Sequence, residues 1–361
     1  MKQKTRLAQI TRRDLLKLAG LGLGSITINP LIKLLPIQEF PASDRLGRIC
    51  RPMSSADLKR KPSYDSPTVK VLYEDTILPW LKEVPGYHPA RNNQRYVETP
   101  EGYIWSADLQ PVRNFPNKPI DSLPKIPQGQ GLWVEVTIPY VDVVLDNPPA
   151  RSPYLRNGAL PRFYYSQVLW VDQMKTDVNG QIWYRINERY GTYGDIFWGQ
   201  AEGFRPIKSE EMTPINPEME EKRIIIDVDW KRQTLSCYEG KTEVYFCLIS
   251  SGREQGATPL GEHSIWRKLV SVHMSGGTTG GGYDLPGIGW TTLFVGDGVA
   301  IHSTFWHNNF GEPESHGCVN ARPEDAQWIF RWTLPAVSYE PGDKTISGSG
   351  STKVKIIEAG Y

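Results

Sequence analysis

The sequence of 361 residues has only four cysteines, six histidines and almost no net charge. Four cysteines are too few for a fold held together by a disulfide framework. Forty-one basic side chains against forty acidic ones give a formal charge of +1, so no overall field indicates a nucleic-acid partner. These scarcities exclude a disulfide scaffold and argue against nucleic-acid binding.

The chain is long enough for two or three domains, each with its own core. It contains 33 glycines, 29 prolines and 11% aromatic residues, a composition typical of a folded, turn-rich protein. Most of its apolar runs are short and bounded by turn residues, as strands are. We therefore expect a mainly β fold.

Residues 1–43 are predicted to be an export signal. A basic stretch, Thr11–Lys17, precedes an apolar run, and its Arg12-Arg13 pair resembles the twin-arginine type. Fifteen residues separate Lys17 from Lys33, which is short for a membrane span of about 20 residues. We expect an exported protein of the periplasm or cell wall, with membrane contact only through an uncleaved signal. A buried amphipathic helix is the alternative, which the arginine pair disfavours.

Two β-rich segments are expected next. Residues 44–115 carry strand patterns at 68–73 and 94–105 and resemble the bacterial SH3-like fold of cell-wall proteins. Residues 130–210 repeat parts of this pattern loosely and are predicted to form a second SH3-like or accessory β module. In the alternative reading, this second segment is β-rich packing with no binding role.

Residues 220–359 are predicted to form a third domain, built mostly of strands. One short helix is expected after Cys318, because Pro323, Glu324 and Asp325 suit a first helical turn. The glycine-rich stretch 276–282 lacks the Gly-Lys-Ser/Thr ending of a phosphate-binding loop. We interpret it as a mobile lid or a passive surface loop.

A hairpin with a Gly240-Lys241 turn is predicted within this domain. Its register would set Cys237 opposite Val244, so that Cys247 points to the other face of the sheet. We therefore expect no disulfide between Cys237 and Cys247.

The sequence Ser315–Asn320 contains Cys318 and lies shortly after His302. A zinc site of His302, His307, His316 and Cys318 matches no common ligand spacing. A core cysteine is disfavoured by its polar surroundings. A nucleophile fits better, because His302 can accept the thiol proton and an imidazolium can lower the thiol pKa, by about 1.5 units for half ionisation at pH 7. Gly317 lets the backbone approach a substrate.

These residues, together with Thr258-Pro259-Leu260-Gly261 and Gly289-Trp290, resemble the catalytic domain of the YkuD-type L,D-transpeptidases from Lys222 to Glu358. Twelve residues separate His302 from Ser315, slightly fewer than usual in the family. The resemblance implies these roles: Cys318 nucleophile, His302 general base, Ser303 carbonyl orienting the imidazole, His316 supporting the site, N–H groups of Gly317 and Cys318 forming the oxyanion hole, and Ser315 and Asn320 fixing the turn.

The function that the resemblance implies is peptidoglycan cross-linking. Cys318 would take the acyl group of a tetrapeptide stem, release D-Ala, and pass the group to the amine of a neighbouring stem as a 3-3 cross-link. It implies no metal or organic cofactor, reaction with carbapenems, and wall or glycan contacts through the SH3-like modules. The alternatives are an L,D-carboxypeptidase with the same site and a catalytically inactive wall-binding protein.

Overall fold

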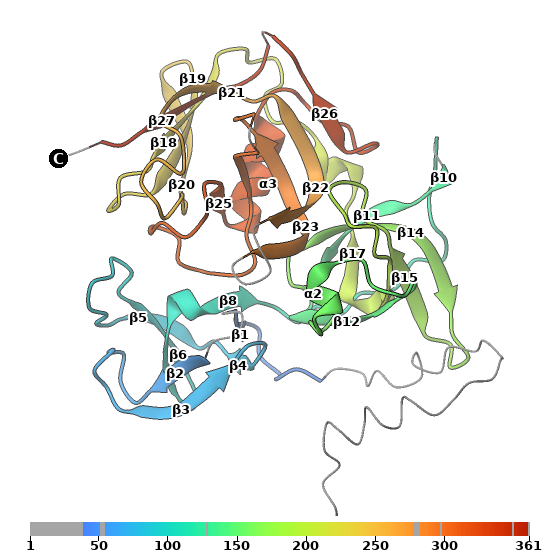
Figure 1. Ribbon diagram of the computed structural model, residues 1–361, viewed down its shortest axis with the longest axis horizontal. Helices are drawn as coiled ribbons and strands as arrows, with labels where there is room; N and C mark the ends of the chain where they lie inside the picture. The colour runs from blue at the N-terminus through green and yellow to red at the C-terminus, as the bar shows by residue number, and fades with distance from the viewer. Residues whose placement is uncertain are drawn as a thin grey trace, which may run out of the picture. The chain divides into compact units, whose positions relative to one another are not determined.

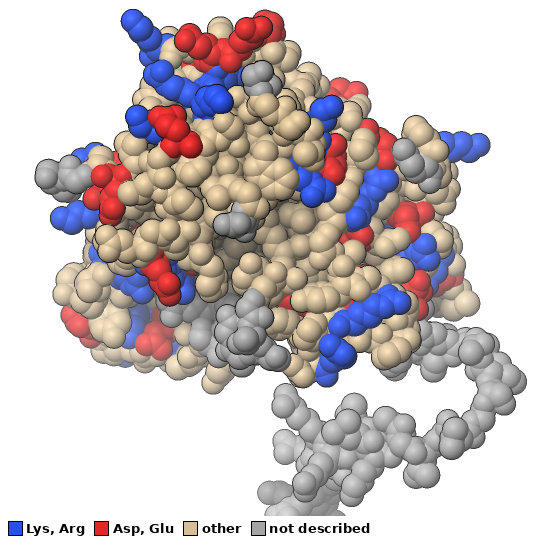
Figure 2. Space-filling view, turned by 45° about the horizontal axis from the view of Figure 1, so that its top comes forward, with Lys and Arg blue, Asp and Glu red and all other residues tan. Residues whose placement is uncertain are grey.

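The computed structural model describes residues 39–50, 55–127, 129–276, 282–296, 298–348 and 350–359. The export signal predicted at 1–43 and the glycine-rich stretch at 276–282 therefore lie almost wholly outside the described residues. Within the described ranges, no helix is long and apolar enough to span a membrane. Basic and acidic side chains are interspersed on the face shown in Figure 2, as the balanced charge predicts. The described elements are mainly strands, so the predicted fold class is confirmed.

The first part of the chain forms two small antiparallel sheets around one core (Figure 1). Buried Ile49, Leu58, Trp80, Val97 and Leu109 belong to that core. A 3-10 turn, η2 (Ser106–Asp108), leads into the last strand. The sheet orders are β4-β1-β8 and β3-β2-β7-β6-β5, with these bounds: β1 Leu46–Ile49, β2 Ser55–Lys59, β3 Thr68–Tyr73, β4 Ile77–Pro79, β5 Lys82–Pro85, β6 Arg95–Thr99, β7 Gly102–Trp105, β8 Leu109–Val112.

The second part forms a seven-stranded sheet with its own core, which includes Val134, Leu169, Tyr184 and Phe204. The sheet order is β13-β12-β16-β15-β14-β11-β17. Shorter elements accompany it: the β9–β10 pair (Lys125–Ile126, Gly129–Gln130), α2 (Pro153–Arg156), η3 (Ala201–Gly203) and η4 (Ser209–Met212). The strands are β11 Leu132–Val136, β12 Tyr140–Leu145, β13 Arg162–Tyr164, β14 Val168–Thr176, β15 Ile182–Ile186, β16 Phe197–Gln200 and β17 Phe204–Pro206.

The sequence repeat between these two parts has a structural counterpart. The succession β6-β7-η2-β8 matches β15-β16-η3-β17 in order, and the residues before the two turns share a conformation, φ −60°, ψ 127° at Trp105 and φ −63°, ψ 125° at Gln200. Both parts thus contain the same unit, two strands followed by a 3-10 turn and a third strand. The SH3-like assignment of either part stays a prediction.

The third part contains two five-stranded sheets with α3 (Pro323–Trp332) between them (Figure 1). This helix confirms the one predicted after Cys318, and Ile226, Ile301 and Ile329 lie in the core shared by helix and sheets. The orders are β20-β19-β18-β27-β21 and β25-β24-β23-β22-β26, with these bounds: β18 Lys222–Asp227, β19 Thr234–Glu239, β20 Thr242–Leu248, β21 Gly261–Ser264, β22 Arg267–Gly276, β23 Tyr283–Leu293, β24 Ala300–Ser303, β25 Val319–Ala321, β26 Asp343–Thr345, β27 Lys353–Ile357.

The hairpin of β19 and β20 corrects one prediction. Glu239 pairs with Thr242 across the expected turn, but a bulge at Val244 sets Cys237 opposite Tyr245. One extra residue moves every later side chain to the other face, so Cys237 and Cys247 both point into the core rather than to opposite faces. All four cysteines are free. The prediction that Cys237 and Cys247 point to opposite faces of the sheet was wrong.

Candidate active site

The predicted nucleophile and base lie on neighbouring parallel strands. In the β24–β25 pair, Ile301 faces Val319 and His302 faces Asn320. Cys318 is the residue immediately before β25, so its backbone lies at the end of the strand next to Ala300. The Cys318 side chain is half-buried, and its Sγ lies 3.6 Å from the carbonyl oxygen of Gly298. The fold therefore brings the thiol and the His302 strand together.

His302 is held as a neutral base. Its Nδ1 lies 2.9 Å from the backbone oxygen of Ser303. Because a carbonyl only accepts, Nδ1 carries the proton and Nε2 has a free lone pair. Burial lowers the pKa of His302 to about 4, against a smaller opposing effect of the Ser303 hydrogen bond. At neutral pH the ring is therefore uncharged and able to accept a proton.

The thiol of Cys318 is also neutral at rest. Burial raises its pKa above the usual thiol value, and a backbone hydrogen bond from Ala300 offsets this only in part. This direction is opposite to the lowered pKa expected from the sequence. The neighbouring histidine was expected to be cationic, but its loss of hydration favours the uncharged ring. The geometry favours proton transfer during attack over a preformed thiolate–imidazolium pair.

The turn before Cys318 is fixed by two hydroxyl groups. Ser315 Oγ donates to the oxygen of Cys318 (2.5 Å) and accepts the N–H of Gly317 (2.9 Å). Thr258 Oγ1 donates to the oxygen of Gly317 at 2.8 Å. Gly317 has φ +149°, and a Cβ there would come within 2.7 Å of the Ala257 oxygen, so only glycine fits. Ser315 Oγ thus holds the backbone of Gly317 and Cys318.

The same contacts bear on the predicted oxyanion hole. Since the N–H of Gly317 is directed to Ser315 Oγ, it is not free to bind a developing oxyanion in this conformation. This departs from the expectation for Gly317. The sequence showed that the backbone can approach a substrate here, but not that a serine two residues earlier would engage its N–H.

His316 and Asn320 occupy different environments. His316 is exposed and stacks on Tyr283 with ring centroids 5.7 Å apart. Asn320 is buried, exchanges backbone hydrogen bonds with Ser250 at 2.9 Å in both directions, and has Nδ2 2.8 Å from His307 Nε2. Asn320 thus supports the strand beside the thiol, whereas His316 lies at its open side.

The four residues considered as zinc ligands do not converge. His307 is buried, and its two ring nitrogens contact the Asn309 N–H and Asn320. Burial lowers its pKa to about 4. Among the described residues, no group of three or more His, Cys, Asp or Glu side chains is arranged to hold a metal. His307 was considered only as a ligand, so its buried structural contacts were missed.

Residues 222–356 match the family model of the YkuD L,D-transpeptidase catalytic domain. We call residues 222–356 the YkuD-type domain after this match. The match agrees with the resemblance inferred from the residues around His302 and Cys318. No curated protein sequence matches the chain.

Several solved structures of L,D-transpeptidases match part of the chain. An Enterococcus faecium L,D-transpeptidase mutant is 24% identical over 42% of this chain and 56% of its own, with TM-score 0.30. An L,D-transpeptidase from Stackebrandtia nassauensis is 19% identical over 42% of this chain and 60% of its own, with TM-score 0.26. One from Mycobacterium smegmatis is 17% identical over 51% of this chain and 81% of its own, with TM-score 0.31. The matches thus span little more than half of the first two chains, and TM-scores this low do not establish a shared fold for the whole chain.

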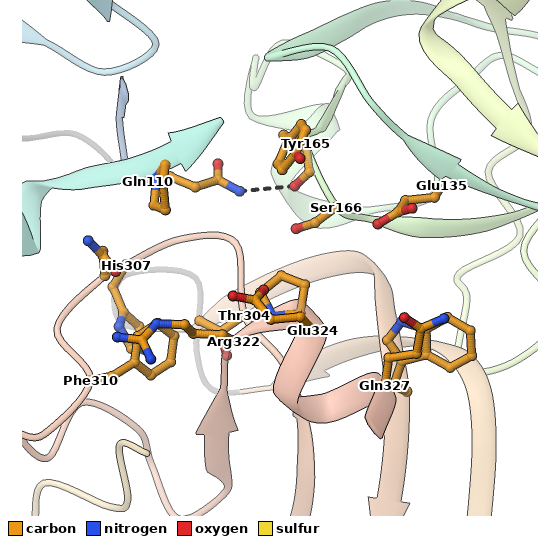
Figure 3. A pocket seen from close by; sticks show the side chains of 14 residues that line it. Gln110, Glu135, Tyr165, Ser166, Thr304, His307, Phe310, Arg322, Glu324 and Gln327 are labelled. Atoms are coloured by element: carbon orange, nitrogen blue, oxygen red, sulfur yellow. Dashed lines mark hydrogen bonds between the residues drawn. The ribbon is translucent and has the colours of Figure 1, made fainter. Parts of the chain in front are cut away.

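A cavity of about 220 Å³ lies where the YkuD-type domain meets the first two parts of the chain (Figure 3). The buried hydroxyls of Ser166 and Thr304 line it and have no hydrogen-bond partner among the described residues. Gln110, Arg322 and Gln327 also face it. It is lined by residues of the loop that follows His302, and Cys318 is not among its lining residues.

A buried charge cluster joins the second part to the YkuD-type domain. His273 Nδ1 lies 2.7 Å from Glu188 Oε2, and Nε2 contacts Asp284 Oδ1. Burial alone would lower the pKa of His273, but the hydrogen bonds to Asp284 and Glu188 outweigh it and raise the pKa to about 10. The ring is therefore a cation between two carboxylates at neutral pH.

The shifted pKa values of His273, His302 and His307 predict that the protein is most stable near pH 6.5, the ordinary histidine pKa. The folded state holds the His273 proton that the unfolded chain releases, so its stabilisation is complete below about 6.5 and is lost as pH rises towards 10. The pKa values of His302 and His307 are lowered on folding, so their effect on stability has the opposite pH dependence. The stability that they contribute is lost as pH falls from about 6.5 to 4. The free energy of unfolding, measured with urea across this range, should fall on both sides of the maximum, along an acid limb and an alkaline limb.

The alkaline limb should disappear in His273→Gln, with a loss of roughly 3–5 kcal/mol near pH 7 because two buried carboxylates lose their cation. His263→Gln is the control, since the described hydrogen bond of His263 joins Nε2 to the backbone oxygen of Pro259 at 2.9 Å and involves no carboxylate. An alkaline limb that persists in His273→Gln would contradict the assignment.

Proposed function

We propose that the protein is an exported peptidoglycan L,D-transpeptidase with Cys318 as its nucleophile. One observation carries the proposal: Cys318 immediately precedes β25, which pairs with the strand of His302, and the Nδ1–H of His302 donates to the Ser303 oxygen so that Nε2 is left as a base. The match of residues 222–356 to the YkuD family supports the reaction class. The apparatus suits acyl transfer, which needs a nucleophile and a base and no redox partner.

In the proposed first step, Sγ of Cys318 attacks the carbonyl of the L-centred residue at stem position three. His302 Nε2 takes the thiol proton as the S–C bond forms. The C–N bond to D-Ala then breaks, the imidazolium gives its proton to the leaving amine, and a thioester remains. Because both groups start neutral, the charges arise only as the carbonyl is attacked.

In the second step, the side-chain amine of a neighbouring stem attacks the thioester. His302 takes the amine proton, the new amide closes the 3-3 cross-link, and the thiol is restored. Backbone N–H groups at 317–318 would stabilise the oxyanion in both steps. For Gly317 this requires its N–H to leave Ser315 Oγ when the stem binds. Water in place of the amine would make the enzyme a carboxypeptidase.

We also propose where the protein works and what it contacts. Export rests on the Arg12-Arg13 signal, and contact with wall glycan rests on the likeness of residues 44–115 and 130–210 to SH3-like modules. A role in cell shape would follow from cross-linking. The stem peptide is the proposed partner in every version of the reaction.

The products of purified protein with disaccharide tetrapeptides test the proposal. We expect cross-linked dimers whose mass shows loss of one D-Ala, detected by mass spectrometry after separation. Tripeptides without dimers would replace the transpeptidase by a carboxypeptidase. Unchanged substrate, together with no covalent adduct on incubation with a carbapenem, would favour the inactive wall-binding protein.

A further inference from the structure

The loop between His302 and Ser315 is unusually buried for a connecting segment. Of its twelve residues, Phe305, Asn308, Asn309, Phe310 and Glu312 are each less than 5% exposed. Such a loop carries many backbone and side-chain polar groups that must find partners. Several of those partners come from the first part of the chain, more than 200 residues earlier.

Arg48 at β1 reaches the beginning of this loop. Its guanidinium is 2% exposed, and Nη2 donates to the oxygen of Phe305 at 2.9 Å. The other donors are fixed within the first part, Nη1 to Asp75 Oδ1 at 2.8 Å and Nε to Gln110 Oε1 at 2.9 Å. The arginine is therefore held rigidly while it binds the residue three positions after His302.

Glu312 receives hydrogen bonds from the first part at the other end of the loop. Its carboxylate, 2% exposed, accepts the N–H of Asn93 (2.7 Å) and Nη1 of Arg91 (3.2 Å). The side chain of Asn93 donates to Asn309 Oδ1 at 3.1 Å. Two further contacts join the middle of the loop, from Asn308 to the oxygens of Ser106 and Ala107.

These contacts continue to the catalytic turn. Asn309 Nδ2 donates to Glu314 Oε1 at 2.6 Å, and Glu314 precedes Ser315, whose hydroxyl holds the Gly317–Cys318 backbone. Ser250 Oγ donates to the oxygen of Asn309 at 3.1 Å. The first part of the chain is thus connected to the His302 end and to the Cys318 end of one short loop.

We infer that residues 46–112 complete the catalytic centre, with Arg48, Asn93 and Glu312 as positioning residues that set Cys318 against His302. The inference rests on the proposed roles of those two residues. It gives the first part a task other than wall binding. The short loop between His302 and Ser315 is thus stabilised by the first part of the chain in addition to its own contacts.

The test uses the full-length protein with Glu312→Ala, Glu312→Gln and Arg48→Lys. Glutamine keeps one oxygen for the N–H of Asn93, and lysine keeps one donor for Phe305. We expect kcat, and the rate of carbapenem acylation, to fall about 100-fold in Glu312→Ala and about 10-fold in Glu312→Gln and Arg48→Lys, with KM changed less than threefold. Glu83→Gln is the matched control, since Glu83 pairs with Arg95 at 3.2 Å and no described contact joins it to the loop.

A second measurement is independent of turnover. The pH dependence of iodoacetamide alkylation reports Cys318, because the other three cysteines are at most 5% exposed. In the positioning variants this profile should shift to higher pH, as in His302→Gln, while circular dichroism stays native. Folded variants with unchanged acylation and alkylation would overturn the inference. If Glu312→Ala does not fold, the results for Glu312→Gln and Arg48→Lys decide whether the inference holds.

The two hypotheses fail differently. A wild type that never acylates, but whose alkylation profile shifts in the variants, would remove the proposed function and leave the positioning role. If the wild type acylates normally and the folded variants show the same acylation and alkylation as the wild type, only the positioning role is removed.

Discussion

Cys318→Ala is expected to abolish acyl-enzyme formation, with the turnover rate falling on the order of 10⁴-fold to 10⁶-fold. No other described thiol can replace it, because Cys50, Cys237 and Cys247 are buried in the core. Intact-mass spectrometry after incubation with imipenem measures the effect directly. Wild-type protein should gain one adduct and the variant none.

Cys247→Ala is the matched control for this loss. Cys247 is 5% exposed on β20, and burial raises its thiol pKa, so its removal should leave the adduct intact. Dimers or an adduct in Cys318→Ala would refute the proposed nucleophile. An adduct that disappears in Cys247→Ala would move the role to a residue that the fold keeps away from solvent.

His302→Gln separates the base from the nucleophile in the same assay. Without a base the rate should fall about 10²-fold to 10⁴-fold at neutral pH. It should then rise with pH towards the raised pKa of the thiol, whereas the wild-type rate has its acid limb near the His302 pKa of about 4. A variant with the wild-type pH profile would exclude His302 as the base.

Lys268→Met is expected to lower stability strongly, with a loss of about 3–5 kcal/mol in the free energy of unfolding. Lys268 is fully buried, and its Nζ donates to the oxygens of Phe330 (2.5 Å), Thr333 (2.7 Å) and Pro335 (2.8 Å). These carbonyls lie at the C-terminal end of α3, where a cation is favoured and otherwise unsatisfied oxygens accumulate. Methionine fills the space but leaves all three without the lysine's hydrogen bonds.

Urea unfolding with Lys344→Met as control checks this expectation. Lys344 pairs with Lys268 across β22 and β26 but is exposed, so its replacement should change stability by less than about 0.5 kcal/mol. Equal effects of the two substitutions would show that the carbonyls at the end of α3 do not depend on Lys268.

The helix at Pro323–Trp332 could be predicted, and the proposed catalytic pair could be singled out, because their signals are local. His302 lies in a short strand and Cys318 immediately before another, and Pro323, Glu324 and Asp325 mark a helix start on their own. The mainly β class followed in the same way from short apolar runs. In these cases each feature depends on residues close in sequence.

Other features depended on contacts that no local pattern contains. Arg48 binds Phe305 across 257 positions, and Asn93 binds Glu312 across 219. The bulge at Val244 reversed the predicted facing of Cys237 and Cys247, because register depends on every residue of both strands. The direction of the Cys318 pKa depended on burial, which motif spacing does not report.

A nucleophile that stays protonated until substrate arrives is also protected from oxidants. An ordinary thiol is only about 3% ionised at pH 7, and the raised pKa of Cys318 leaves it still less thiolate. Peroxides and disulfides react with the thiolate, so they should modify Cys318 slowly. Outside the reducing cytoplasm, where we propose that the protein works, the raised pKa of Cys318 would keep the thiol available for its acyl donor.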